Sequence, residues 1–184
     1  MSGIALGLEA AANRLERDPA GVAELLERTR VEADAAVREI RRVLEGLRPA
    51  ALDRHGLVDA LRETAYSLGM GAPGRPAFRL RVDAVPFLPP DVEESAFRIA
   101  AESMTNVARH SGAEHCSVEI SQSNGDLRIG VIDDGHGGAS TRPMGHGLDS
   151  MRRRAADVGG RLTVASIEPH GTAVTAALPL QAPS

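Results

Sequence analysis

The stretch Val131-Ile132-Asp133-Asp134-Gly135-His136-Gly137-Gly138 joins an apolar strand to two carboxylates and a run of glycines. Three interpretations are open for such a stretch: an acidic metal-binding loop, an ordinary β-turn, or a wall against which a nucleotide lies. Each interpretation predicts different residues elsewhere in the chain, so the surrounding sequence has to decide between them.

The segments around this stretch predict an α+β domain. Residues 116–123 and 126–132 alternate like strands and are joined by Asn124-Gly125, a strong type I′ hairpin signal. A second hairpin is expected over 162–167 and 172–178, and a further strand over 78–85. Helices are expected over 57–68, 91–110 and 148–158, which gives about five strands and three helices to cover one sheet face.

Residues 3–47 predict two helices joined by a tight connection at 18–21. Apolar and small residues of the second helix recur at alternating spacings of four and three, the heptad pattern of a bundle seam: Val22, Leu26, Thr29, Ala33, Ala36, Ile40, Val43 and Leu47. Two short helices with narrow stripes cannot bury both sides against each other, so a second copy is expected to complete a four-helix bundle. The alternative is that the hairpin packs on its own downstream domain.

Composition excludes several classes of function. The formal charge of −4 is interspersed rather than blocked, and aromatic residues make up only 2% of the 184 residues, so no nucleic-acid partner is expected. All 21 basic residues are Arg, which removes the Lys that the P-loop and the eukaryotic-type protein kinase site need. No apolar run is long enough to span a membrane, so a cytoplasmic chain without direct membrane contact is expected, whether or not a parent protein is membrane-anchored.

The helix expected over 91–110 carries two different faces. Glu102, Asn106, Arg109 and His110 fall in one line, which brings a carboxylate, an amide and basic groups together. A carboxylate and an amide can help to hold Mg²⁺, and Arg109 can supply charge to phosphates. The alternative is the solvated face of an amphipathic helix, whose other stripe packs on the sheet: Val92, Ala96, Ala100, Met104 and Val107.

A second glycine cluster, Gly145-His146-Gly147-Leu148, stands where the helix over 148–158 begins. Glycines at a helix N-terminus let backbone N–H groups approach phosphate. By itself such a cluster is more often a plain turn, but its place after the acidic strand end favours a phosphate site.

These residues together resemble a known family. Glu102-x-x-x-Asn106, Asp133-x-Gly135-x-Gly137, Gly145-x-Gly147-Leu148 and Gly171-Thr172 resemble, in order and spacing, the N, G1, G2 and final Gly-Thr boxes of GHKL ATPases in sensor histidine kinases. The linker-like segment 46–61 resembles the nitrate-sensor and DesK-like subfamily.

The resemblance implies an α+β chain with a defined domain order. Residues 1–48 would be a partial dimerisation hairpin, half of a dimeric four-helix bundle, and 49–68 a linker with the first helix of the catalytic domain. Residues 69–184 would form an ATP-binding Bergerat-type sandwich with a mixed sheet of about five strands and three helices.

The resemblance also implies roles for single residues. Asp133 would accept a hydrogen bond from the adenine amine, with Thr172 beneath the base, and Gly135 and Gly137 would let the base and the ATP lid approach. Asn106 would ligate Mg²⁺, Glu102 would help to position water or substrate, and Arg109 and His110 would lie near the phosphates. Gly145, Gly147 and Leu148 would frame the hinge of a short lid over 139–144. Asp134 and His136 are expected to be incidental.

The implied function is the catalytic region of a two-component sensor histidine kinase, which passes the γ-phosphoryl group of ATP to a histidine and then to an aspartate of a response-regulator receiver domain. The phosphoacceptor box of the subfamily is absent, so the chain resembles a truncated piece of a longer kinase that binds ATP without phosphorylating itself. Two alternatives remain open: a GHKL serine kinase of the anti-sigma type, and a non-catalytic dimerisation or regulatory module with a nucleotide site.

Overall fold

The computed structural model describes residues 5, 9–12, 18, 21–33, 49–69, 74–83, 85, 87–137 and 146–181. The chain divides into two compact units, Met1–Arg48 and Pro49–Ser184. The second unit contains the acidic strand end with which the sequence analysis began, and it is an α+β sandwich.

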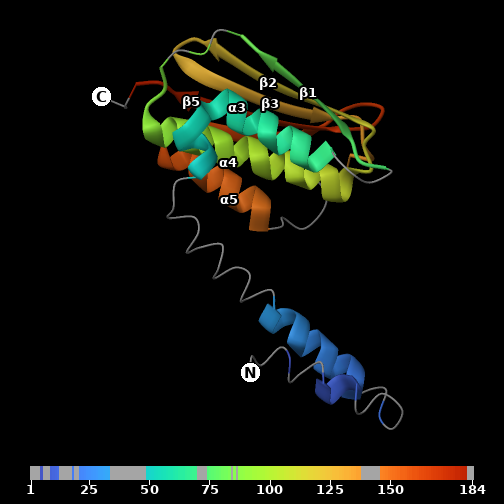
Figure 1. Cartoon of the computed structure of the whole chain (residues 1–184). Helices are drawn as coiled ribbons and strands as arrows, with labels where there is room; N and C mark the ends of the chain where they lie inside the picture. The colour runs from blue at the N-terminus through green and yellow to red at the C-terminus, as the bar shows by residue number, and fades with distance from the viewer. Residues whose placement is uncertain are drawn as a thin grey trace. The chain divides into compact units, whose positions relative to one another are not determined.

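A five-stranded mixed sheet forms one layer of this unit (Figure 1). Its strands are β1 (Ala77–Val82), β2 (His115–Ser123), β3 (Asp126–Asp133), β4 (Arg161–Ser166) and β5 (Thr172–Pro179), in the spatial order β1-β2-β3-β5-β4. β1 runs parallel to β2, and the other neighbours are antiparallel. The predicted turn between β2 and β3 is confirmed, because Asn124 and Gly125 both have positive φ, 55° and 80°, as a type I′ turn requires.

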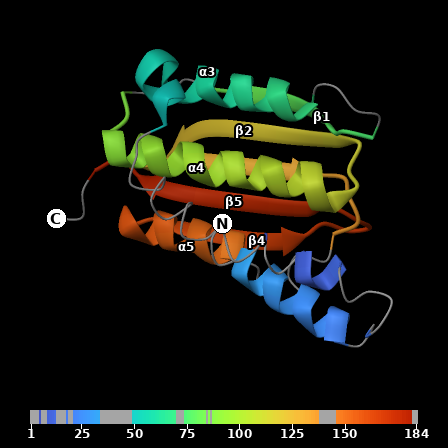
Figure 2. The same cartoon turned by 60° about the horizontal axis from the view of Figure 1, so that its bottom comes forward.

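Three helices form the other layer, and they lie on the same face of the sheet (Figures 1 and 2). α3 (Ala50–Gly69) packs over β1, α4 (Pro90–Asn106) over β3 and β5, and α5 (His146–Asp157) over β4 and β5. The stripe predicted to face the sheet is confirmed as buried, from Val92 at 4% exposure to Val107 at 7%. It packs in one core with side chains of the strands and of the other two helices, among them Leu61, Ile120, Leu127, Met151 and Leu178.

Among the element boundaries that differ from prediction are the start of α3 and the end of β1. α3 begins at Ala50, whereas a helix was expected only from residue 57, because two helical pieces meet at Gly56 with a φ of 71°. The second piece begins at Leu57, whose N–H donates to Glu93 Oε1 at 3.1 Å. β1 ends at Val82 rather than at residue 85, before prolines at 86, 89 and 90 that cannot donate to a strand ladder.

In the first unit, residues 21–33 are helical within the predicted second helix. Two seam positions are buried, Val22 at 3% and Thr29 at 7% exposure, but Leu26 on the same seam is 44% exposed. The seam residues from Ala36 to Leu47 lie outside the described part of the chain. No helix among the described residues is both long and apolar enough to cross a membrane.

Candidate nucleotide-binding site

The site begins with Asp133, the last residue of β3. Its side chain is buried, with 6% exposure, and its Oδ1 accepts the N–H of Gly135 at 2.9 Å. Thr172 opens β5 opposite Asp133 in the strand register, is also buried, and donates a backbone hydrogen bond to the Asp133 carboxylate. Burial is the largest influence on this carboxyl and raises its pKa above 3.8, although both backbone donors act in the opposite direction.

The glycines after Asp133 are required by the protein's own packing. A Cβ on Gly135 would collide with the carbonyl oxygen and Cβ of Ser111. Gly137 has a φ of 71°, and a Cβ there would lie 2.9 Å from the carbonyl oxygen of Gly171. The loop therefore threads tightly between the end of α4 and the start of β5.

α4 ends in a π-helical turn, η1 (Val107–Ser111), which Gly112 closes with a φ of 64°. The Ser111 carbonyl accepts the N–H of His136 at 2.9 Å, so the turn holds the loop that follows Asp133. Ser111 Oγ in turn donates to the Val107 carbonyl at 2.9 Å and accepts the Ala113 N–H at 3.0 Å. Single π-helical turns are frequent at functional sites, and this one fixes the end of the helix that carries Glu102 and Asn106.

The start of α5 meets α4 at these same two residues. A Cβ on Gly147 would lie 2.5 Å from Glu102 Oε1 and 3.6 Å from Asn106 Nδ2, so a larger residue there would displace the end of the Glu102 side chain. Glu102 and Asn106 are half-buried, whereas Arg109 and His110 are exposed. Leu148 packs on the core, and Gly145 lies outside the described residues.

The structure brings the predicted residues together in two groups. Glu102, Asn106 and Gly147 form one group, and Asp133 with Gly135, Gly137 and Thr172 forms the other. Ser111, which sequence reasoning missed, contacts the second group from the helical turn that continues the first. The carboxylate of Glu102 and the amide oxygen of Asn106 are hard oxygen donors beside a helix N-terminus, a set that fits Mg²⁺ together with phosphate oxygens.

Asp134, which is expected to be incidental to the nucleotide site, makes several contacts within the protein. Its Oδ1 accepts the backbone N–H groups of Glu114 and His115, both at 2.9 Å, and its Oδ2 lies 3.0 Å from His115 Nδ1. The hydrogen bond from the His115 backbone is the largest cause of a lowered pKa at Asp134. The pattern of side chains in the sequence does not predict these bonds, because two of the three partners are backbone groups 19 and 20 residues away.

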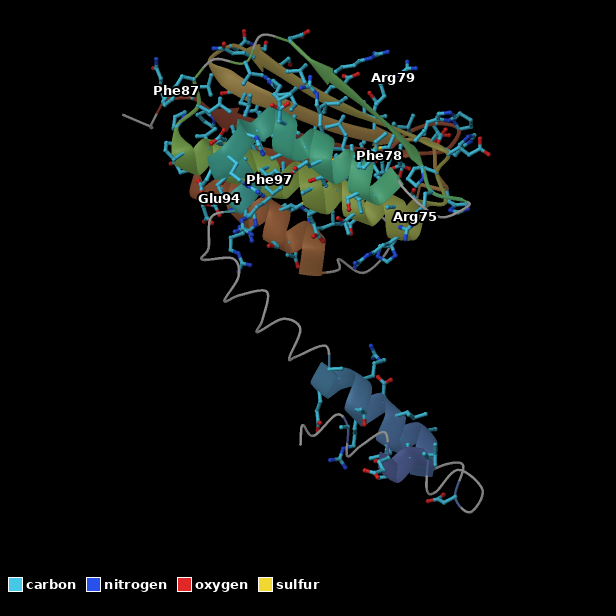
Figure 3. All side chains as sticks on the ribbon, viewed as in Figure 1. Arg75, Phe78, Arg79, Phe87, Glu94 and Phe97 are labelled. Carbon is cyan, nitrogen blue, oxygen red and sulfur yellow. The ribbon has the colours of Figure 1, made fainter. Side chains whose placement is uncertain are left out.

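A separate groove of about 510 Å³ lies between α3 and β1. Figure 3 labels two of its lining residues, Arg75 and Phe78. Arg75 Nη1 donates to the Ala108 carbonyl of η1 at 3.4 Å. The groove contains none of the residues predicted for nucleotide binding.

Comparison with known families agrees with this geometry. Residues 91–182 match the family of histidine kinase-, DNA gyrase B- and HSP90-like ATPases, and residues 1–52 match a family described as histidine kinase. The chain belongs to this ATPase family.

Its relatives narrow the class further. The sensor histidine kinase LiaS of Bacillus subtilis is 33% identical over 150 residues, which cover 80% of this chain and 41% of LiaS. The sensor histidine kinase MctS of Rhizobium johnstonii is 32% identical over 189 residues, which cover 98% of this chain and 40% of MctS. The chain is the ATP-binding catalytic region of a two-component sensor histidine kinase, and it spans about 40% of the length of these two relatives.

A solved structure shares the fold. The Acinetobacter baumannii histidine kinase AdeS superposes with a TM-score of 0.56 at 14% identity, over 95% of each chain.

Proposed function

We propose that this region binds Mg-ATP between Asp133 and Asn106 and passes the γ-phosphoryl group to a histidine, from which an aspartate of a response-regulator receiver domain takes it. One observation carries the proposal. The helical turn that ends α4 contacts the loop after Asp133 through Ser111, and α4 itself contacts the start of α5 through Glu102 and Asn106. The carboxylate that binds the base and the helix start that binds the phosphates are therefore both held by α4.

Asp133 reads the adenine. The carboxylate accepts backbone hydrogen bonds from Gly135, at Oδ1, and from Thr172, and a lone pair that neither donor uses accepts the exocyclic amine of the base. The acid is buried, so a purine without that amine leaves it without the bond it needs. Thr172 lies beneath the base, and Gly135 and Gly137 keep this wall free of side chains.

The phosphates lie over the start of α5. Its N-terminal N–H groups and helix dipole attract anions, and Gly145, Gly147 and Leu148 frame the hinge of the lid. Asn106 holds Mg²⁺, which neutralises phosphate charge when it is bound, and Glu102 positions the group that accepts the phosphoryl. Arg109 and His110 are exposed on η1, where they can reach phosphate oxygens.

Two protein partners follow from this function. A second copy of the chain pairs through the N-terminal helices, and a response-regulator receiver domain accepts the phosphoryl group. The exposed Leu26, on a seam that also contains buried Val22 and Thr29, supports the first pairing.

The stability of the transferred phosphate tests the reaction. When the natural protein that carries this region is incubated with γ-labelled ATP, the label should be acid-labile and alkali-stable, as phosphohistidine is. Acid-stable label would favour the serine kinase alternative instead.

The 184-residue chain provides a control for this assay. Its six histidines begin at His55, so residues 1–48 contain no acceptor, and the chain should bind ATP without becoming labelled. Acid-labile label on this chain would show that one of these six histidines is an acceptor, contrary to the proposal.

A further inference from the structure

Asp134 ties the end of β3 to the start of β2. Its carboxylate accepts the backbone N–H groups of Glu114 and His115 at 2.9 Å each, and its second oxygen lies 3.0 Å from the His115 ring. Its own N–H donates to the His115 carbonyl at 3.3 Å. These bonds extend the strand pairing by one step beyond the Cys116–Asp133 pair.

The loop is anchored again two residues later. The His136 N–H donates to the Ser111 carbonyl at 2.9 Å, and Gly135 is pressed against the same serine. Gly135 therefore lies between one anchor at Asp134 and another at His136. This placement fixes the direction of the Gly135 N–H, which donates to Asp133 Oδ1.

The orientation of the Asp133 carboxylate depends in part on that N–H, because the Thr172 backbone is its other donor. The terminal torsion of an aspartate is broad, so burial alone does not decide which oxygen faces the base. The Gly135 N–H engages Oδ1, and Thr172 also donates a backbone hydrogen bond to this carboxylate, so the two backbone donors together set which lone pairs remain for the base. Release of the Asp134 anchor would let Gly135 move and the carboxylate turn.

We propose that Asp134 is a positioning residue for adenine recognition, which acts through Gly135 on the carboxylate of Asp133. The proposal rests on the function proposed above, in which Asp133 accepts the adenine amine. It assigns to the second acid of the loop a part in base selectivity, although that acid itself does not touch the base.

The test compares two nucleotides, Mg-ATP and Mg-purine riboside triphosphate, which lacks the 6-amino group. The wild-type protein should prefer ATP by about tenfold or more, the value of one hydrogen bond to a charged group. Asp134→Ala should reduce this preference to about threefold or less, chiefly through weaker ATP binding, while affinity for the amine-free nucleotide changes by less than about twofold.

Two variants serve as matched controls. Asp134→Asn retains an oxygen that can accept the two backbone N–H groups, and should keep most of the preference. Glu114→Ala removes an exposed side chain, but leaves its N–H in place as a donor to Asp134, and should behave as wild type.

The outcomes separate the two proposals. An unchanged ATP preference in Asp134→Ala, or an equal loss of affinity for both nucleotides, would overturn the positioning role. A wild-type protein without any ATP preference would instead contradict the adenine contact of Asp133.

A second variant covers the case in which thermal melting shows that Asp134→Ala does not fold. His115→Ala removes only the 3.0 Å ring contact and should lower the preference about two- to threefold. An unchanged preference in that variant would then count against the proposal.

Discussion

Two adjacent carboxylates, Asp133 and Asp134, differ in burial and in the direction of their pKa shifts. Asp133 is buried, and burial raises its pKa, because the charged form loses water. Asp134 is largely exposed and has its pKa lowered, chiefly by the backbone hydrogen bond from His115 and further by the His115 side chain and the Glu114 N–H. The first acid is buried and accepts two backbone hydrogen bonds, and the second is exposed and held by Glu114 and His115.

The lowered pKa of Asp134 predicts a pH-dependent stability. A carboxyl that binds protons less readily when folded contributes stability above its unfolded pKa, near 3.8, and loses that contribution as the pH falls through its folded pKa. Wild type should therefore melt at a higher temperature than Asp134→Asn near neutral pH, with a gap that narrows below pH 3.8. A constant gap down to the lowest pH at which both proteins remain folded would contradict this assignment.

Gly147 offers a second test at the residue scale. Gly147→Ala places a Cβ 2.5 Å from Glu102 Oε1, the movable end of a side chain, so the fold should survive while Glu102 is displaced. We expect Mg-ATP affinity to fall about tenfold, or 1.4 kcal/mol, in a binding titration.

Gly130→Ala is the matched control for that substitution. Its added Cβ would make only an ordinary contact of 3.8 Å with Glu119 Cβ. It should leave the affinity unchanged, and equal losses in the two variants would show that the contact of Gly147 with Glu102 has no special part in binding.

Prediction from sequence was most informative for residues whose side chains carry the chemistry. The place of Asp133 at a strand end and the spacing of Glu102 and Asn106 on one helix face could be derived from the pattern of residue types. The contacts of Asp134 and Ser111 could not be derived in this way, because each residue bonds to backbone groups that only the fold brings close.

At the scale of elements, the hairpin at Asn124-Gly125 and the buried stripe of α4 were predictable, since turn chemistry and periodicity are local signals. The π-helical turn at Val107–Ser111 was not, because the sequence continues the α-helical periodicity through it. The short helical piece before Gly56 was also missed, and the bond that begins the second piece, from Leu57 to Glu93, joins residues 36 positions apart and is not a local signal.

The contact between Glu93 and α3 predicts a stabilising role. Glu93 Oε1 accepts the N–H that begins the second piece of α3, as a capping side chain does. Glu93→Ala should destabilise the protein by about 1 kcal/mol and lower the melting temperature by roughly 3–5 °C.

The exposed Glu63 of α3 provides the comparison. Glu63→Ala should change the melting temperature by much less. Equal melting temperatures for the two variants would rule out the capping role of Glu93.

At the scale of the whole molecule, the order of the sequence boxes indicated a shared site and the family resemblance implied a mixed sheet, but the parallel pairing of β1 with β2 was not predicted. A strand's neighbours depend on connections that residue patterns do not specify. Because the chain divides into two units, Met1–Arg48 and Pro49–Ser184, the pairing of two copies and the binding of nucleotide can be tested separately.

Leu26→Glu tests the pairing of two copies. Leu26 is 44% exposed on a seam whose neighbours are buried, and a carboxylate there would have to be desolvated in a four-helix bundle. Sedimentation should show the wild-type chain as a dimer and the variant as a monomer with unchanged ATP affinity. Glu24→Gln, on the exposed side of the same helix, should remain a dimer, and a monomeric wild-type chain would contradict the pairing.

The most direct test of the central claim is a calorimetric titration with Mg-ATP. Asp133→Asn should abolish measurable binding while the melting curve shows a folded protein, because the buried acceptor for the adenine amine is changed. Asp126→Asn, at the opposite end of β3, should bind as wild type does. Equal affinities for wild type and Asp133→Asn would contradict the account of this site as a nucleotide site read by Asp133.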